Sequence, residues 1–309
     1  MKKRYFNLIK LLLVLSLASG SMLFSKTNQA QASEPPSTKT FYKFSKLSYV
    51  NARKEKSSIV NQLPSGWKFV EQIDDVYNPY HAAFRPNGAI SSGLSLSVFV
   101  NNDKDQVVIA YRGTSGGWVD WHNNLRAATG DENVQVKNAH LYLNYFYKNN
   151  EKYREYDWFF TGHSLGGWLS QKLFLDAENN TVYNTSSNKY KYYGKIKKKS
   201  ISKAVTFNPI PMSIKHTPSA DWEDMDSESD VTNHVIQNEV LNEFIVVKPN
   251  EFKYLGKVKY YDRNIKNLYQ LGYSKSQLRE MSDNQLMKFL YDNKSGFGKM
   301  FQGHSLKSF

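Results

Sequence analysis

The sequence predicts an α/β fold in which helices flank a mixed, mostly parallel β-sheet. Two observations support this prediction: short β-branched apolar runs bounded by polar turns, and apolar residues at helical spacing between those runs. The 309 residues are 40% hydrophobic and 15% aromatic, which is enough for a substantial core and excludes a disordered chain. Neither an internal repeat nor a second linker interrupts the chain, so we expect one domain.

Predicted strands and helices follow one another in the order of such a fold. The apolar runs 94–100 and 106–112 flank a polar segment and predict a hairpin. Further strands are predicted over 156–161, 202–207 and 234–237, and a terminal pair over 244–249 and 257–261. Helices are predicted over 118–128, 136–149, 165–177 and 274–291, the last capped by Ser274 or Ser276. The alternation of strands with helices favours a partly parallel sheet.

The first 32 residues have the order of a secretory signal peptide. Basic residues come first, an apolar stretch follows over 11–24, and Ala30-Gln31-Ala32 supplies the small residues of a cleavage site. The alternative is a membrane anchor, but the stretch is short for the roughly 20 apolar residues of a spanning helix. We expect cleavage after Ala32, a flexible linker over 33–40, a single domain over 41–309, and a secreted, extracellular protein.

The net charge of +13 changes once this segment is set aside. Five of the 41 basic residues and none of the 28 acidic ones lie in it, which leaves 36 against 28, a net charge of +8. Seven lysines gather in Lys189–Lys203 with three tyrosines between them. For a secreted chain this segment predicts transient contact with an anionic lipid surface rather than nucleic acid. The alternative is an exposed loop.

The motif with the clearest chemistry is Gly162-His163-Ser164-Leu165-Gly166, a G-x-S-x-G pattern. It lies between a predicted strand and a predicted helix, the context in which a sharp turn exposes the serine hydroxyl. The helix that follows directs backbone N–H groups and its positive end at a developing oxyanion. The pattern predicts that Ser164 is a nucleophile. The alternative is a glycine-containing structural turn.

A serine nucleophile needs a base, and in this architecture the base follows the serine and the acid along the chain. The histidines after Ser164 are His216, His234 and His304. His234 lies in a predicted strand, where a core or surface role is expected, and His216 precedes the candidate acids near residue 239. We favour His304, which we expect in a loop after the last helix.

Glu239 is the favoured acid because it directly follows the predicted strand 234–237. Its rivals are Asp262 and the acidic run 221–230, which is typical of a solvated surface. For the oxyanion hole, Thr114 at the end of the 106–112 strand offers a backbone N–H and a hydroxyl, and the N–H of Leu165 is its expected partner. The alternative for Thr114 is a simple turn.

The long polar segment 209–232 contains scattered apolar residues and predicts a lid over the site. It lacks the alternating oxygen ligands and the turn glycine of a calcium-binding loop, so we expect no metal and no other cofactor. The complete absence of cysteine excludes disulfides, thiolate nucleophiles and cysteine-based metal sites.

From about residue 94 onward the chain resembles the class 3 lipases, the fungal-lipase-like branch of the α/β hydrolases. The similar segments are Val108–Thr114, Asp120-Trp121, Thr161–Gly167, Thr206–Pro209, Asn238–Val240 and the terminal His304. The resemblance implies an α/β-hydrolase-type fold and an acyl hydrolase with Ser164 as nucleophile, His304 as base and Thr114 in the oxyanion hole. The family usually has Asp where Glu239 stands, and Gly-Ala-Pro where this chain has Asn208-Pro209-Ile210.

We therefore expect a secreted serine hydrolase that cleaves carboxylic esters of lipids, of the triacylglycerol lipase or phospholipase A type. Two alternatives stay open. An acyltransferase would use the same residues with another alcohol in place of water. A non-catalytic protein that binds anionic surfaces would use the segment Lys189–Lys203.

Overall fold

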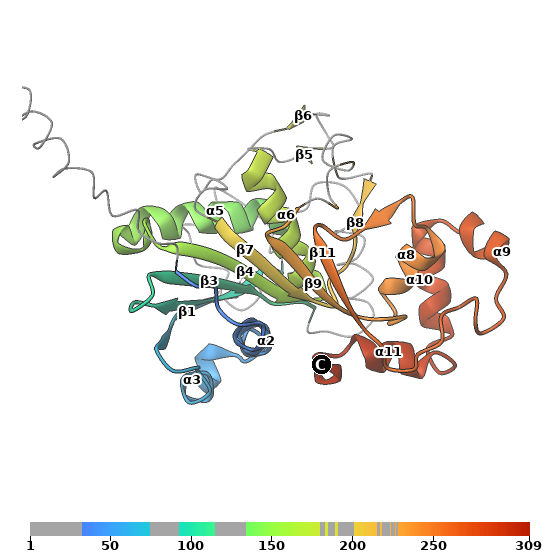
Figure 1. Cartoon of the computed structure of the whole chain (residues 1–309), viewed down its shortest axis with the longest axis horizontal. Helices are drawn as coiled ribbons and strands as arrows, with labels where there is room; N and C mark the ends of the chain where they lie inside the picture. The colour runs from blue at the N-terminus through green and yellow to red at the C-terminus, as the bar shows by residue number, and fades with distance from the viewer. Residues whose placement is uncertain are drawn as a thin grey trace, which may run out of the picture. The chain divides into compact units, whose positions relative to one another are not determined.

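A seven-stranded sheet with the order β1-β2-β3-β4-β7-β9-β11 runs through the described residues (Figure 1). The computed structural model describes residues 33–74, 93–114, 134–179, 183–184, 189–190, 201–214, 217, 223, 226 and 228–309. The strands of the sheet are β1 (Trp67–Asp74), β2 (Ser95–Asn101), β3 (Gln106–Tyr111), β4 (Asp157–His163), β7 (Ile201–Phe207), β9 (Val231–Ile236) and β11 (Lys257–Tyr261).

The first three strands of the sheet pair antiparallel, and β2 and β3 form the predicted hairpin. From β3 through β4, β7 and β9 to β11 every neighbouring pair is parallel. The prediction of a mixed, mostly parallel sheet is therefore confirmed. Because parallel strands end at the same edge, the segments that follow β3, β4, β7 and β9 meet there.

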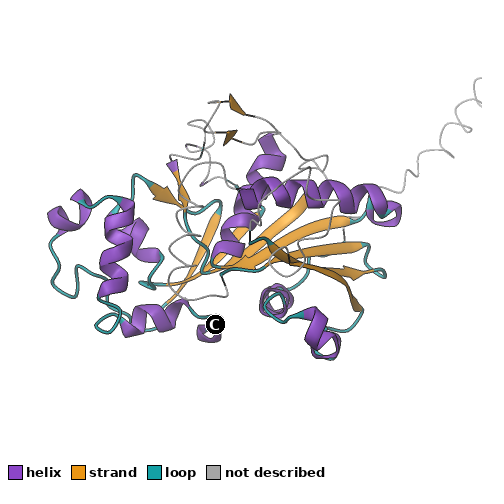
Figure 2. Ribbon diagram, turned by 180° about the vertical axis from the view of Figure 1, so that it is seen from behind, coloured by secondary structure: helices purple, strands orange, loops and turns teal. Residues whose placement is uncertain are grey.

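Helices lie on both faces of the sheet within the unit Pro35–Phe309 (Figures 1 and 2). The described helices are α2 (Thr38–Leu47), α3 (Ala52–Val60), α5 (Val134–Asn149), α6 (Leu165–Asn179), α8 (Asn242–Val247), α9 (Lys275–Glu280), α10 (Asp283–Asp292) and α11 (Gly298–His304). Short 3₁₀ turns span Glu151–Tyr153 and Leu306–Ser308. Two small ladders join β5 (Tyr183–Asn184) to β6 (Lys189–Tyr190) and β8 (Met212–Ser213) to β10 (Phe252–Lys253).

Alternating side chains of the central strands separate two hydrophobic cores. On β3, Val107 and Ile109 pack in the core that α5 and α6 cover. Val108 and Ala110 point the other way, into a core formed with Phe41 and other apolar residues of α2. Successive side chains of a strand face opposite sides, so a strand apolar throughout is buried on both faces. The near-continuous apolar runs in the sequence have this cause.

Three of the predictions for local structure are wrong. Residues 244–249 are not a strand: helix α8 covers most of them, and β11 pairs with β9 instead. The single helix predicted over 274–291 is two helices, α9 and α10, because Ser282 starts a new helix with its own cap. The linker predicted over 33–40 ends earlier, since Ser37 accepts a hydrogen bond from the Thr40 N–H and caps α2.

The helix predicted over 118–128 lies outside the described residues. The other predicted strands and helices are confirmed to within a few residues. In the part of the chain that the structure describes, every helix is too short or too polar to cross a membrane.

Candidate active site

Ser164 occupies the turn between β4 and α6. His163 is the last residue of β4 and Leu165 the first of α6, so one residue makes the whole change of direction. Its φ angle is +58°, a left-handed conformation that costs a non-glycine residue energy. Ser164 is 3% exposed, and its backbone is held by hydrogen bonds from its N–H to Phe207 O and from the Trp168 N–H to its carbonyl. This is the strained strand–turn–helix geometry that the motif predicts.

The two glycines of the motif are required by close backbone contacts. A Cβ on Gly162 would lie 2.3 Å from the backbone of Gly166, and one on Gly166 would lie 2.1 Å from the carbonyl oxygen of Tyr111. Neither gap admits a side chain. Helix α6 therefore starts directly against the ends of β3 and β4, which fixes where the Ser164 hydroxyl points.

His304 and Glu239 meet Ser164 in one hydrogen-bonded chain. The His304 Nε2 lies 2.9 Å from Ser164 Oγ, and its Nδ1 lies 2.8 Å from Glu239 Oε2. Glu239 is fully buried, while the side chain of His304 is 15% exposed. His304 is the last residue of α11 rather than a loop residue, so the sequence predicted its neighbourhood but not its secondary structure.

The Glu239 carboxylate is held by the start of α8. Oε1 accepts from the Asn242 N–H at 2.8 Å, and Oε2 accepts from the Leu241 N–H at 3.0 Å. Backbone N–H groups at a helix start are short of partners and favour a negative charge. These two hydrogen bonds and the one to His304 hold the carboxylate in place. The glutamate side chain, which is longer than aspartate, thus reaches the His304 ring.

One predicted oxyanion donor comes shortly after β3, and the other is adjacent in sequence to Ser164. Leu165 follows it at the first position of α6 and is buried. Thr114 follows Gly113, and a Cβ on Gly113 would lie 3.1 Å from the Cβ of Ser164. The segment after β3 thus passes close to Ser164, which is where the predicted role of Thr114 requires it.

Asn208, after β7, is a site residue that sequence reasoning did not select. Its side-chain amide donates to the carbonyls of Gly303 and His304 at 2.9 and 3.2 Å, and its Oδ1 accepts from the Ile236 N–H at 2.8 Å. It therefore ties the His304 segment to the end of β9. Its place directly after a strand was visible in the sequence, but its partners are far away along the chain.

The rival residues lie elsewhere. His234 is buried in β9, where its Nδ1 lies 2.6 Å from the Tyr261 hydroxyl and its ring stacks on Phe207, in keeping with a core role. Asp262 is exposed and accepts from the Asn264 N–H. His216, five of the ten residues of the acidic run 221–230, and residues 191–200 of the lysine-rich segment lie outside the described residues, as does part of the predicted lid.

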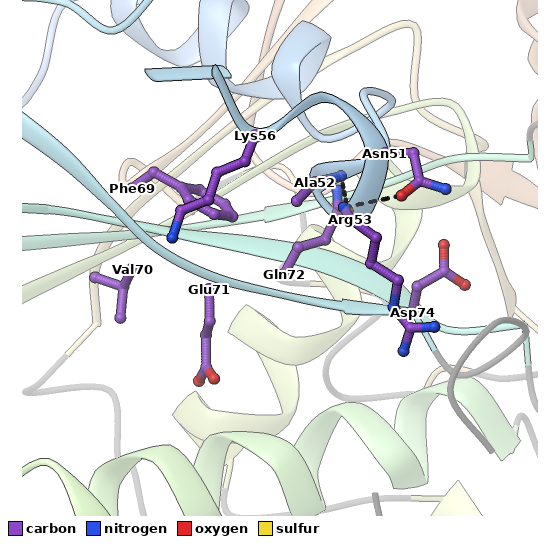
Figure 3. A pocket seen from close by; sticks show the side chains of 9 residues that line it. All are labelled: Asn51, Ala52, Arg53, Lys56, Phe69, Val70, Glu71, Gln72 and Asp74. Atoms are coloured by element: carbon purple, nitrogen blue, oxygen red, sulfur yellow. Dashed lines mark hydrogen bonds between the residues drawn. The ribbon is translucent and has the colours of Figure 1, made fainter. Parts of the chain in front are cut away.

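A polar cavity of about 190 Å³ lies between α3 and β1 (Figure 3). Charged side chains of both signs line it, among them Arg53 and Glu71. Ser164 and His304 are not among its lining residues, so this cavity is separate from the hydrogen-bonded chain. Across the described residues no cluster of His, Asp and Glu side chains has the arrangement of a metal site.

The mixed sheet and the serine at its strand–helix turn define a hydrolase of the lipase-like class. A family model described as "Phospholipase-like: Tle-like phospholipase domain" matches residues 43–210, more than half of the 309 residues. The chain belongs to this family. It is thus an ester hydrolase, and the family implies a lipid ester as substrate.

Several solved fungal lipases are similar to the chain at low identity. Lip2 lipase from Yarrowia lipolytica is 12% identical over 71% of this chain and 77% of that one, with a TM-score of 0.44. Rhizomucor miehei triacylglyceride lipase is 14% identical over 72% and 78%, with a TM-score of 0.43. Lipase II from Rhizopus niveus is 12% identical over 72% and 79%, with a TM-score of 0.43. No curated protein matches the chain.

Proposed function

We propose that this protein is a secreted serine hydrolase that cleaves carboxylic ester bonds of lipids through a Ser164–His304–Glu239 triad. The observation that carries the proposal is the continuous chain from Ser164 Oγ through both ring nitrogens of His304 to the buried Glu239. A family described as phospholipase-like favours a phospholipid over a triacylglycerol as substrate.

The hydrogen bonds indicate which atoms of the triad carry a proton. An ionised carboxylate only accepts hydrogen bonds, so His304 Nδ1–H donates to Glu239, which holds the ring in that tautomer. The lone pair of Nε2 then faces the Ser164 hydroxyl and accepts its proton as Oγ attacks the ester carbonyl. Glu239 also stabilises the imidazolium that forms.

The remaining steps follow from the same groups. The backbone N–H groups of Leu165 and Thr114 bind the oxyanion of the tetrahedral intermediate. His304 returns its proton to the leaving alcohol, and the acyl group stays on Ser164 Oγ. Water then attacks the acyl-enzyme and gives up a proton to His304. A second oxyanion collapses, the fatty acid leaves, and Ser164 regains its proton.

Replacing Ser164 with Ala tests the mechanism. We expect turnover of a p-nitrophenyl ester to fall by roughly 10⁵-fold or more, with an unchanged circular dichroism spectrum. Ser202→Ala is the matched control, because Ser202 lies near the start of β7, at the opposite end of the sheet from Ser164, and bonds only Asp157 among the described partners. The mechanism is wrong if Ser164→Ala retains wild-type activity.

Product analysis separates the alternatives. Mass analysis of products from mixed phospholipid and triacylglycerol emulsions identifies the ester that is cut. A competing alcohol that appears in the products as a new ester would indicate an acyltransferase. A non-catalytic surface-binding protein would bind anionic vesicles in a salt-sensitive way and leave Ser164 unlabelled by a fluorophosphonate probe.

Secretion and lipid contact are part of the proposal. The basic, apolar and small-residue order of residues 1–32 supports export, and N-terminal sequencing of the exported protein would test cleavage after Ala32. Seven lysines between 189 and 203 support transient binding to anionic lipid, which vesicle sedimentation at increasing salt would test.

A further inference from the structure

The motif residue His163 makes hydrogen bonds through both ring nitrogens. Its Nδ1 lies 2.9 Å from the Tyr49 hydroxyl, and its Nε2 lies 2.6 Å from the carbonyl oxygen of His304. The two histidine rings also lie side by side, with centroids 4.8 Å apart and planes at 36°. His163 is therefore in direct contact with the ring and backbone of the proposed base.

The direction of these bonds follows from their partners. A carbonyl only accepts, so His163 Nε2 carries the proton. Burial, reinforced by the nearby His304, lowers the pKa of His163 to about 3, so the ring is neutral and its Nδ1 accepts. The Tyr49 hydroxyl donates to that Nδ1 and itself accepts from the Gly113 N–H at 3.1 Å. One directed chain thus joins Gly113 to His304.

The Tyr49 hydroxyl lies where three segments of the site meet. A Cβ on Gly113 would lie 2.4 Å from this hydroxyl, 2.6 Å from the His163 carbonyl oxygen and 3.1 Å from the Cβ of Ser164. Gly113 also precedes Thr114, the proposed oxyanion residue. A single hydroxyl therefore contacts the oxyanion segment and the residue that supports the base.

We propose that Tyr49 is a positioning residue for this reaction, which holds the Gly113–Thr114 segment and, through His163, the base His304 in mutual register. This inference rests on the proposed function. Tyr49 reaches the site from the turn that follows α2, the helix that packs on β4 and β7. Asn208 also donates to the His304 carbonyl at 3.2 Å, so loss of Tyr49 loosens this support without releasing His304.

The test compares Tyr49→Phe with the same substitution at Tyr42, a tyrosine of α2 seven positions earlier in the chain. Tyr42 donates its hydroxyl to Leu306 O at 2.9 Å, so it also bonds the C-terminal segment but touches no proposed reacting group. We expect Tyr49→Phe to lower kcat about tenfold or more and leave KM and the unfolding temperature near wild type, since register is needed only in the transition state. Tyr42→Phe should keep kcat within about twofold.

Two outcomes overturn the inference. One is a Tyr49→Phe enzyme with kcat within twofold of wild type. The other is an equal loss of kcat in both variants together with a lower unfolding temperature, which would mean a merely structural hydroxyl.

A second measurement does not depend on activity. Nitrogen-15 NMR of the histidine rings should show His163 neutral and protonated at Nε2 between pH 5 and 8, and Tyr49→Phe should shift its Nδ1 resonance as that nitrogen loses a donor. A doubly protonated His163, or an unmoved Nδ1 resonance, would also overturn the inference. If the wild type hydrolyses no ester, the proposed function fails, while the NMR result still decides whether this chain of hydrogen bonds exists.

Discussion

Ser164 combines the hydroxyl of the proposed nucleophile with a strained backbone. A left-handed φ of +58° on a serine costs about 1–3 kcal/mol, and such a conformation persists only where the surroundings enforce it. Here Gly162 and Gly166 enforce it, since their missing side chains let α6 start against β3 and β4. The strain is a consequence of presenting Oγ at the edge of the sheet, where His304 lies 2.9 Å away.

The sequence was sufficient to select the three residues of the proposed triad but not the residues that hold them. Ser164 has a local motif, and the chain order of this architecture narrows the choice of acid and base. Asn208 and Tyr49 have no such signal, because their role consists of bonds to residues 95 and 114 positions away. An isolated Asn or Tyr has many possible partners, and only tertiary structure selects among them.

Glu239→Gln tests the acid at this scale. The amide keeps the length of the side chain but presents an NH₂ group to backbone N–H donors or to His304 Nδ1–H, so the ring loses its tautomer. We expect kcat to fall by roughly 10⁴-fold, as when a triad carboxylate becomes an amide. Steady-state kinetics on a p-nitrophenyl ester measure this. Asp262→Asn is the control and should stay near wild type, whereas a Glu239→Gln enzyme with a tenth of wild-type kcat would contradict the role.

At the scale of elements, α8 shows how a buried group overrides local preference. Residues 244–249 include Ile245, Val246 and Val247, which favour a strand. The chain is nonetheless helical, because the Glu239 carboxylate binds the N–H groups of Leu241 and Asn242 and so starts a helix. Phe244 and Val247, three residues apart, are then both buried. The sequence predicted a strand over this segment, and the structure has a helix.

The break between α9 and α10 has a local cause that the sequence contained. Ser282 and Gln285 form a capping box, in which each side chain bonds the backbone N–H of the other. Apolar residues continue at helical spacing across the break, so periodicity alone predicted one helix. The S-x-x-Q signal was the better guide to the boundary.

Ser282→Ala should therefore destabilise the protein by about 1 kcal/mol, the usual cost of losing a side-chain N-cap. Ser274→Ala is the matched control: Ser274 also precedes a helix, α9, but makes no side-chain cap bond, so its loss should cost a few tenths of a kcal/mol at most. Urea unfolding of both variants measures the difference. Equal losses would show that the capping box adds no stability.

For the whole molecule, both ends of the unit Pro35–Phe309 contribute to the site. Near the start of this unit Tyr49 lies in the turn after helix α2, and near its end His304 is the last residue of α11. The last residue, Phe309, packs edge-on against Phe207 and Tyr261. Local patterns predicted the hairpin of β2 and β3, whereas the meeting of the two ends of the unit depends on contacts more than 250 residues apart, such as Tyr42 with Leu306.

From three buried groups we expect the free energy of unfolding to pass through a maximum with pH. Burial lowers the pKa of His163 from 6.5 to about 3 and that of His234 from 6.5 to about 4. Below pH 6.5 these two histidines bind protons in the unfolded chain but stay neutral in the native state. The free energy of unfolding therefore falls as the pH falls. Burial raises the pKa of Glu243 from 4.5 to about 8, helped by the nearby charge of Glu239. Between pH 4.5 and about pH 8 Glu243 is protonated in the native state and ionised in the unfolded chain. The contribution of Glu243 to the free energy of unfolding therefore falls as the pH rises.

The two effects place the maximum of the free energy of unfolding near pH 6.5. Below this pH the loss from two histidines is larger than the gain from one glutamate, and above it the decline comes from Glu243. We expect the free energy of unfolding to fall above pH 6.5 by up to about 1.4 kcal/mol per pH unit until about pH 8. Glu243→Gln mimics the protonated acid, so its advantage in stability over wild type should grow from pH 5 to pH 8, and it should lose the alkaline decline. Urea unfolding between pH 5 and 9 measures both proteins. A wild-type stability that rises steadily to pH 8, or an identical decline in Glu243→Gln, would show that Glu243 is ionised in the native state and that another group sets the alkaline limit.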